Sequence, residues 1–293
     1  MELADLAIFR TVVDEGGIVK AARKLHRVPS GVTTRVKQLE ASVGAQLFYR
    51  DRQRLFLSPA GALLLDYADQ LLRLSAEAKA VVSGSPPSGV LRLGALESTT
   101  ASRLPDVLAA YHGACPDVRV ELRTGTNDAL TVAVAAREID AAFVAEVPLD
   151  RNLAAMPLFA ERLVIISSAA HQRIARPQDV EGDSVIAFPN GCAYRRVLQR
   201  WLGTARAASV RVLELGSYHA IVACVASGTG IALVPESVLD TVRHAQVLRH
   251  ALPKVLSHLT TPLIWRASEQ PLAVIALRQV LDAHRPGTRR RAA

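Results

Sequence analysis

Basic side chains are concentrated in one short stretch of the chain. The 293 residues have a formal net charge of +8, and residues 18–57 contain nine basic but only two acidic residues. Lysines and arginines clustered in this way neutralise the phosphates of a nucleic acid and release its counterions. The stretch therefore favours a polyanion-binding surface. From charge alone, a solvated basic face without a partner is the alternative.

The residue types in this stretch suit contacts to duplex DNA. Thr33 and Thr34 can hydrogen-bond to base edges or touch a thymine methyl group, and Arg35 and Lys37 can reach phosphates. Arginines alternating with apolar residues at 48–57 would reach the backbone or the minor groove. The predicted DNA-binding residues are Arg27, Pro29, Ser30, Thr33, Thr34, Arg35, Lys37, Arg50, Arg52 and Arg54.

A second group of polar residues follows strands predicted in the C-terminal two thirds. Ligands of open α/β sheets bind beyond the carboxyl ends of strands, where helix N-termini present free N–H groups. Hydroxyls, amides and a base there suit a small anionic or zwitterionic molecule, and Glu97 suits an ammonium group. Helix capping is the alternative for each residue taken singly. The predicted effector-binding residues are Glu97, Ser98, Thr99, Thr100, Thr126, Asn127, Cys192, Tyr194, Arg195, Tyr218 and His219.

The sequence lacks the patterns of common catalytic and metal sites. No Gly-x-Ser-x-Gly motif surrounds Ser98, and the eight histidines lack metal-ligand spacing. We therefore predict no enzyme activity, no metal and no cofactor. Three cysteines without such spacing indicate a reducing compartment, and a thiol switch at Cys192 or Cys224 stays open.

The predicted DNA-contacting residues lie on short helices. Apolar residues at helical spacing predict helices over 3–13, 18–25 and 29–43, and Pro29 suits the first position of the third. A helix, a short turn and a second helix with a polar outer face place that second helix in the major groove. Residues 48–57 predict a two-stranded wing. A three-helix bundle with a charged hairpin is the alternative.

A long helix is predicted to follow the wing. Ser58 and Pro59 suit its start, and about 24 residues would give a length near 36 Å. Its apolar residues step by four and three, which favours pairing with the same helix of a second copy. Packing against its own domain is the alternative. The heptad stripe consists of Ala60, Leu64, Tyr67, Leu71, Leu74, Ala78 and Val81.

The remaining chain alternates predicted strands and helices, which indicates mostly parallel sheets with helices on both faces. No apolar run reaches the ~18–20 residues of a membrane span, and the first residues carry acids where a secretory signal carries bases. We expect a cytoplasmic protein without a membrane partner. The predicted domains are residues 1–58, the linker helix and hinge at 59–88, and an effector domain at 89–293.

Four segments resemble the winged helix-turn-helix signature of LysR-type transcriptional regulators. In order and spacing, they are AARKLH (21–26), VTTRVKQLE (32–40), GAQLFYR (44–50) and LSPAG (57–61). Many members of that family carry Ser-Gln where this chain has Val28-Pro29, and Arg where it has Thr34. The operator sequence is therefore not predicted from the family.

The resemblance implies a fold and a set of partners. The α/β half would resemble a periplasmic binding protein, with lobes of about 89–161 plus 267–293 and of 162–266. The chain would bind double-stranded promoter or operator DNA, and a small amine, amino acid or carboxylate effector would modulate its output. It would form a homodimer through the long helix and a homotetramer, with RNA polymerase as a further candidate partner. A small-molecule binding module or enzyme with an accessory helical domain is the alternative function.

Overall fold

The chain folds into two units, which are described separately. The computed structural model describes residues 1–51, 54–180, 184–242, 246–268 and 270–284. One unit is Met1–Ser85 and the other is Pro86–Ala293. Among the described residues, no helix is long and apolar enough to cross a membrane.

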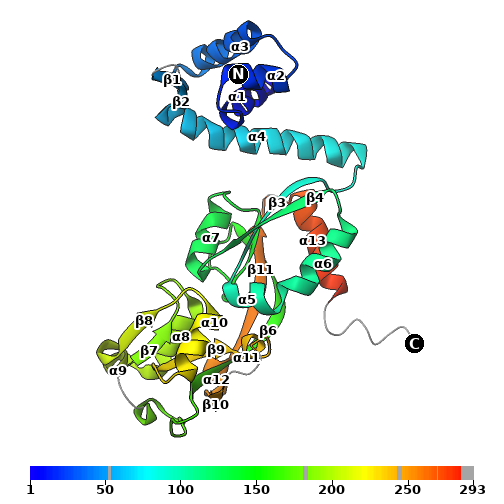
Figure 1. The fold of residues 1–293 in the computed structure, drawn as a ribbon. Helices are drawn as coiled ribbons and strands as arrows, with labels where there is room; N and C mark the ends of the chain where they lie inside the picture. The colour runs from blue at the N-terminus through cyan, green and yellow to red at the C-terminus, as the bar shows by residue number, and fades with distance from the viewer. Residues whose placement is uncertain (52–53, 181–183, 243–245, 269, 285–293) are drawn as a thin grey trace, which may run out of the picture. The chain divides into compact units, whose positions relative to one another are not determined.

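The first unit contains the predicted helices and hairpin within one or two residues of their expected ends. It consists of α1 (Leu3–Asp14), α2 (Ile18–Lys24), α3 (Pro29–Val43), β1 (Phe48–Asp51), β2 (Arg54–Leu57) and α4 (Pro59–Ser83) (Figure 1). Pro29 opens α3, and Gly44 ends it in the left-handed conformation that glycine adopts without strain. Phe9 and Leu39 are fully buried between the helices.

The hairpin joins α4 through a tight junction. The Ser58 hydroxyl accepts a hydrogen bond from the Gly61 N–H at 2.9 Å, so it caps α4 as predicted. The Ser58 N–H donates to the Leu47 carbonyl oxygen at 2.9 Å. A Cβ atom on Gly61 would lie 2.2 Å from that same oxygen. Position 61 therefore admits only glycine without movement of the backbone.

We expect Gly61→Ala to lower the free energy of unfolding by about 2–4 kcal/mol, because a methyl group must displace the Leu47 backbone. Urea unfolding followed by circular dichroism measures the loss. Gly113→Ala, in a helix position with open space around it, is the matched control and should be neutral or stabilising. Equal midpoints for the two variants would contradict the prediction.

Helix α4 has two apolar faces. Ala68 is fully buried against α1, with Leu64, Leu65 and Leu72 beside it, and Asp69 pairs with Arg10. The opposite face exposes a stripe of large apolar side chains, whose members are Leu63, Tyr67, Leu71, Leu74 and Val81. Packing within the unit thus accounts for only one side of the helix.

The second unit is a two-lobed mixed α/β structure. Its described strands follow the order β4-β3-β5-β11-β6-β9-β7-β8, and β10 also pairs with β6. We call the part around β3, β4 and β5 the first lobe, and the part around β7, β8, β9 and β10 the second lobe. The first lobe contains β3 (Gly89–Ala95), α5 (Glu97–Ser102), α6 (Leu104–Ala114), β4 (Val118–Thr124), α7 (Asn127–Ala135), β5 (Ala141–Phe143) and α13 (Leu272–Ala283).

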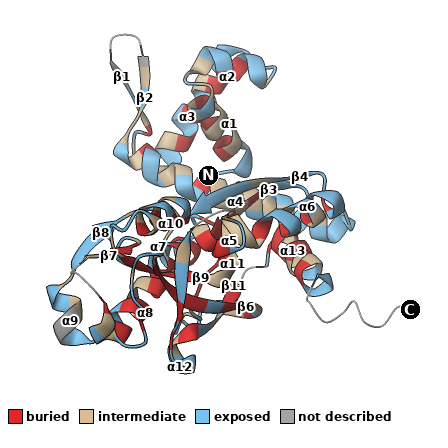
Figure 2. Cartoon of the chain, turned by 60° about the horizontal axis from the view of Figure 1, so that its bottom comes forward, coloured by how far each residue is buried: buried red, intermediate tan, exposed pale blue. Residues whose placement is uncertain are grey.

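The second lobe contains β7 (Ser184–Ala187), α8 (Ala193–Leu202), α9 (Thr204–Ser209), β8 (Arg211–Glu214), α10 (Tyr218–Ala226), β9 (Ile231–Pro235), α11 (Glu236–Leu239), β10 (Val247–Ala251) and α12 (Lys254–Ser257). Two long strands, β6 (Leu153–Ser168) and β11 (His258–Arg266), run through both lobes. Figure 2 shows buried residues along these central strands.

The prediction of mostly parallel strands is wrong for the connecting strands. Neighbours within each lobe, such as β3 with β4 and β7 with β8, are parallel. Every pairing of β6 or β11 with a neighbour is antiparallel. The reason is topological, because β6 takes the chain into the second lobe and β11 brings it back in the opposite direction. Local alternation of strands and helices does not reveal this return.

Candidate functional site

Helix α3 presents a polar and basic face. Ser30, Thr34 and Lys37 are exposed on it, and Arg27 and Pro29 are exposed at its start. Its apolar residues, such as Val32 and Leu39, are buried. The helix therefore points its polar side chains to solvent, as the sequence predicted.

The two threonines of this face are partly engaged within the helix. The Thr33 hydroxyl donates to the Pro29 carbonyl oxygen at 2.9 Å, and the Thr34 hydroxyl donates to that of Ser30 at 3.0 Å. Their oxygens can still accept a hydrogen bond, and their methyl groups can contact a thymine methyl. Donation from these hydroxyls to a base edge would require a change of rotamer.

Arg35 has a structural partner that the sequence did not reveal. Its guanidinium donates to Oδ1 of Asp5 at 3.0 Å, and Asp5 is 7% exposed. The pair links α3 to the first turn of α1. An arginine held in this way fixes the position of α3, in addition to any contact with a phosphate.

We expect Arg35→Ala to lower the free energy of unfolding by about 1–3 kcal/mol, because it leaves a buried carboxylate without its charged partner. The exposed Lys37→Ala on the same helix should change it by less than ~0.5 kcal/mol. In urea unfolding, the double variant Arg35→Ala/Asp5→Ala should lose less free energy of unfolding than the two single variants lose together. Strict additivity would contradict the coupling.

The wing is held to α3 by an acidic side chain. Oε1 of Glu40 accepts the N–H groups of Leu47 and Phe48, at 2.8 and 3.3 Å. The contacts of the wing arginines are not described. Arg52 lies outside the described residues, and Arg50 and Arg54 are described only as members of β1 and β2.

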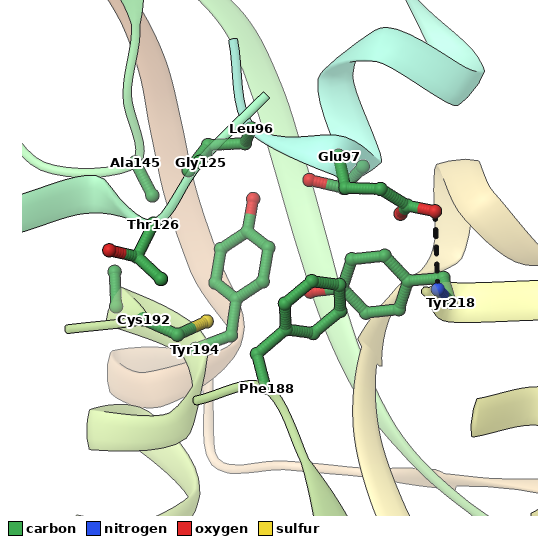
Figure 3. Close-up of a pocket in the computed structure, with 11 residues that line it drawn as sticks. Leu96, Glu97, Gly125, Thr126, Ala145, Phe188, Cys192, Tyr194 and Tyr218 are labelled. Carbon is green, nitrogen blue, oxygen red and sulfur yellow. Dashed lines mark hydrogen bonds between the residues drawn. The ribbon is translucent and has the colours of Figure 1, made fainter. Parts of the chain in front are cut away.

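A narrow cleft lies between the two lobes of the second unit. It lies at strand ends, as expected for an α/β sheet. Six of the predicted residues line it, namely Glu97, Ser98, Thr126, Cys192, Tyr194 and Tyr218, and the structure adds Leu96, Gly125, Ala145, Phe188 and Ala193 (Figure 3). Their ligand-binding role remains a prediction.

Glu97 is the acidic residue of this cleft. Its Oε1 accepts the N–H of Tyr218 at 3.2 Å. Burial raises the pKa of Glu97, against the opposing effects of that N–H group, His219 and Ser217. Because the folded-state pKa is raised, the contribution of Glu97 to stability is lost as the pH rises through it. Burial in the cleft thus destabilises the ionised carboxylate relative to its protonated form.

Two predicted effector residues are engaged by contacts within the protein. The amide oxygen of Asn127 accepts the N–H groups of Ala145 and Glu146, at 3.0 and 3.3 Å, and so shapes the loop after β5. Arg195 donates to a carboxylate oxygen of Glu214 and is held at the edge of β8. Neither side chain lines the cleft. These contacts are a loop hydrogen bond and an ion pair, and not the helix capping stated as the alternative for single residues.

Three further predicted residues also lie outside the cleft lining. Thr99 is buried, the Thr100 hydroxyl donates to the Leu96 carbonyl oxygen at 3.0 Å, and His219 is exposed. The aromatic Phe188 was missed, although it directly follows strand β7. Ligands of α/β sheets bind beyond the carboxyl ends of strands, so Phe188 could have been predicted if apolar residues at these ends had been considered with the polar ones.

Cys192 does not have the character of a reactive thiol. It is buried, and burial raises the pKa of its thiol, which disfavours the nucleophilic thiolate. Cys115 is likewise buried with a raised thiol pKa. A thiol switch at Cys192 is therefore disfavoured.

Ion pairs connect the lobes beside the cleft. Arg196 of α8 donates to both carboxylate oxygens of Asp128, at 3.0 and 3.1 Å, and to Glu146 at 2.6 Å. At the connecting strand, buried Glu161 accepts from Arg103 of the first lobe and Ser237 of the second, at 2.9 and 2.7 Å. These contacts tie the lobes together around the cleft.

Known proteins match both units. Residues 3–62 match the family described as "Bacterial regulatory helix-turn-helix protein, lysR family", and residues 84–286 match "LysR substrate binding domain". The chain is 36% identical over 292 residues to the uncharacterized HTH-type transcriptional regulator YusT of Bacillus subtilis, covering 98% of this chain and 96% of that protein. It is 33% identical to the HTH-type transcriptional regulator GltR of the same species, covering 91% and 90%.

Solved structures have the same fold. A full-length OxyR variant from Pseudomonas aeruginosa matches with a TM-score of 0.71 at 20% identity, over 98% of this chain and 96% of that one. Full-length CbnR complexed with its target DNA matches with a TM-score of 0.64 at 20% identity, over 96% and 99%. Because the family descriptions match both units and YusT and GltR are similar along nearly the whole chain, the chain belongs to the LysR family of DNA-binding transcriptional regulators.

Proposed function

We propose that this regulator binds operator DNA as a homodimer within a homotetramer, and that a small molecule in the cleft changes that binding. The single observation that supports DNA contact through α3 is its exposed face of Ser30, Thr34 and Lys37. The N-terminal part of such a helix enters the major groove, and the wing contacts the flanking backbone or minor groove. CbnR, which has the same fold, has been crystallised with its target DNA.

The exposed stripe of α4 supports assembly. Leu63, Tyr67 and Leu74 are 67%, 63% and 60% exposed on one helix. Apolar side chains at heptad spacing are buried when two such helices pair. A homodimer supplies two recognition helices for two half-sites. The tetramer is an extension that the family resemblance implies.

The lobed unit supports regulation by a small molecule. An effector shifts an equilibrium only if it binds one arrangement better than another. The ion pairs of Arg196 join the lobes, so a ligand between them would change the energy of their arrangement. The promoter output would then follow the effector concentration.

The experiment is fluorescence anisotropy with labelled DNA from upstream of the regulator's own gene, over a series of salt concentrations. The expected result is saturable binding whose log affinity falls linearly with log salt. The slope should correspond to the release of several counterions. Competitor DNA of random sequence should displace the probe only at a large excess. Equal affinity for both DNAs would overturn the assignment of an operator site.

A further inference from the structure

The described lining of the cleft contains an acidic side chain and no basic one. Of the described residues that line it, Glu97 is the only acidic one, and none is a lysine, arginine or histidine. The arginines nearby in sequence are paired elsewhere, because Arg195 contacts Glu214 and Arg196 contacts Asp128 and Glu146. A negatively charged ligand would therefore meet a carboxylate without a compensating cation from the lining.

The N-terminus of α10, at the cleft, already has a side-chain partner. The N–H of Tyr218, at the start of α10, already donates to Glu97. This backbone donor, of the kind that would hold a carboxylate, is thus engaged by a side chain of the chain itself.

Glu97 has one carboxylate oxygen without a partner. Oε1 receives the N–H of Tyr218, whereas Oε2 is buried and makes no hydrogen bond with any described residue. A buried carboxylate oxygen without a donor is costly, and a charged donor would relieve that cost. The unsatisfied atom points to a ligand group that carries N–H donors and a positive charge.

Aromatic rings line the cleft together with Glu97. The rings of Phe188 and Tyr218 have centroids 4.6 Å apart and are tilted by 42°. Figure 3 shows the Glu97 carboxylate above Tyr218, whose N–H it accepts, and the ring of Phe188 next to that of Tyr218. Ring faces attract cations through their quadrupole, and an aromatic surface with one carboxylate is a common way to hold an ammonium group.

We propose that the effector of this cleft is a small organic ammonium compound whose nitrogen lies between the Glu97 carboxylate and the rings of Phe188 and Tyr218. The proposal rests on the proposed function, because the cleft is taken as the effector site.

The test is a thermal-shift and calorimetric titration of the full chain in phosphate buffer at neutral pH. The probes are n-butylammonium, tetramethylammonium and, as a size-matched anion, pentanoate. We expect at least one ammonium probe to bind with a Kd below about 10 mM and to raise the melting temperature, while pentanoate does neither. Binding of pentanoate alone, or of no ammonium probe, would overturn the proposal.

Glu97→Gln removes the charge but retains an oxygen that can accept the Tyr218 N–H. It should raise the Kd for the ammonium probe at least about tenfold. It should not lower the melting temperature of the ligand-free protein, because the ionised carboxylate is destabilised there. Glu138→Gln, which removes an exposed carboxylate paired with Arg123 in the same lobe, is the matched control and should bind the probe normally. Equal Kd values for both variants would refute the proposal.

Phe188→Leu is a second variant that keeps the charge of the cleft. It replaces the ring by an aliphatic side chain and should weaken ammonium binding by about three- to tenfold. If Glu97→Gln fails to fold, this variant decides the outcome, and unchanged affinity would count against the proposal.

A titration of n-butylammonium into the protein–DNA complex separates this proposal from the proposed function. Binding of the ammonium probe without any change in DNA affinity would support the cation site and contradict effector control. A change in DNA affinity caused by pentanoate, with no ammonium binding, would support effector control and contradict the cation site.

Discussion

Lys37→Glu is expected to lower the affinity for upstream DNA by roughly 100-fold at about 0.1 M salt. Lys37 is exposed on α3. The substitution replaces an attraction to a phosphate by a repulsion in both copies of a dimer. The slope of log affinity against log salt should become shallower by about one or more per copy, because each lost phosphate contact releases fewer counterions. Anisotropy titrations at several salt concentrations measure both quantities.

The control for this prediction is Lys254→Glu. Lys254 is exposed in the second unit, and its replacement changes the net charge by the same amount. A general effect of charge would weaken both variants equally, which would contradict a specific role of α3. Lys37→Glu should also keep the unfolding midpoint of the parent, because Lys37 is exposed. Arg35 is a poorer target for this test, because its replacement also leaves the Asp5 carboxylate without its charged partner.

Leu74→Glu is expected to weaken the homodimer by on the order of 1,000-fold. Leu74 is 60% exposed in the apolar stripe of α4, on the side away from the residues that pack within its own unit. In a paired helix, burial of each leucine contributes about 1.5–3 kcal/mol, and the substitution removes it from both copies and adds two negative charges. Sedimentation velocity over a range of protein concentrations measures the change.

The DNA affinity of Leu74→Glu should fall with the dimer, because two linked recognition helices bind two half-sites more tightly than one. Val132→Glu is the matched control, since Val132 is 64% exposed on helix α7 of the second unit. A dimer of unchanged stability in Leu74→Glu would show that the stripe of α4 does not form the interface.

The first unit was predictable because its signals are local. Pro29 at the start of α3, Gly44 at its end and Ser58 as the cap of α4 fix helix ends through contacts within a few residues. Apolar spacing then determines which face of each helix is buried. The same reasoning placed Glu97 and Tyr194 at strand ends, where they line the cleft.

The sequence by itself therefore determined the order of the elements, the exposed face of α3 and the end of the sheet at which a cleft would lie. Only the tertiary structure decided that Arg35 pairs with Asp5, that Asn127 and Arg195 are held away from the cleft, and that β6 and β11 run antiparallel to their neighbours. Periodicity and capping act over a few residues. These pairings join residues that are far apart in the chain, and the packing of whole elements selects them.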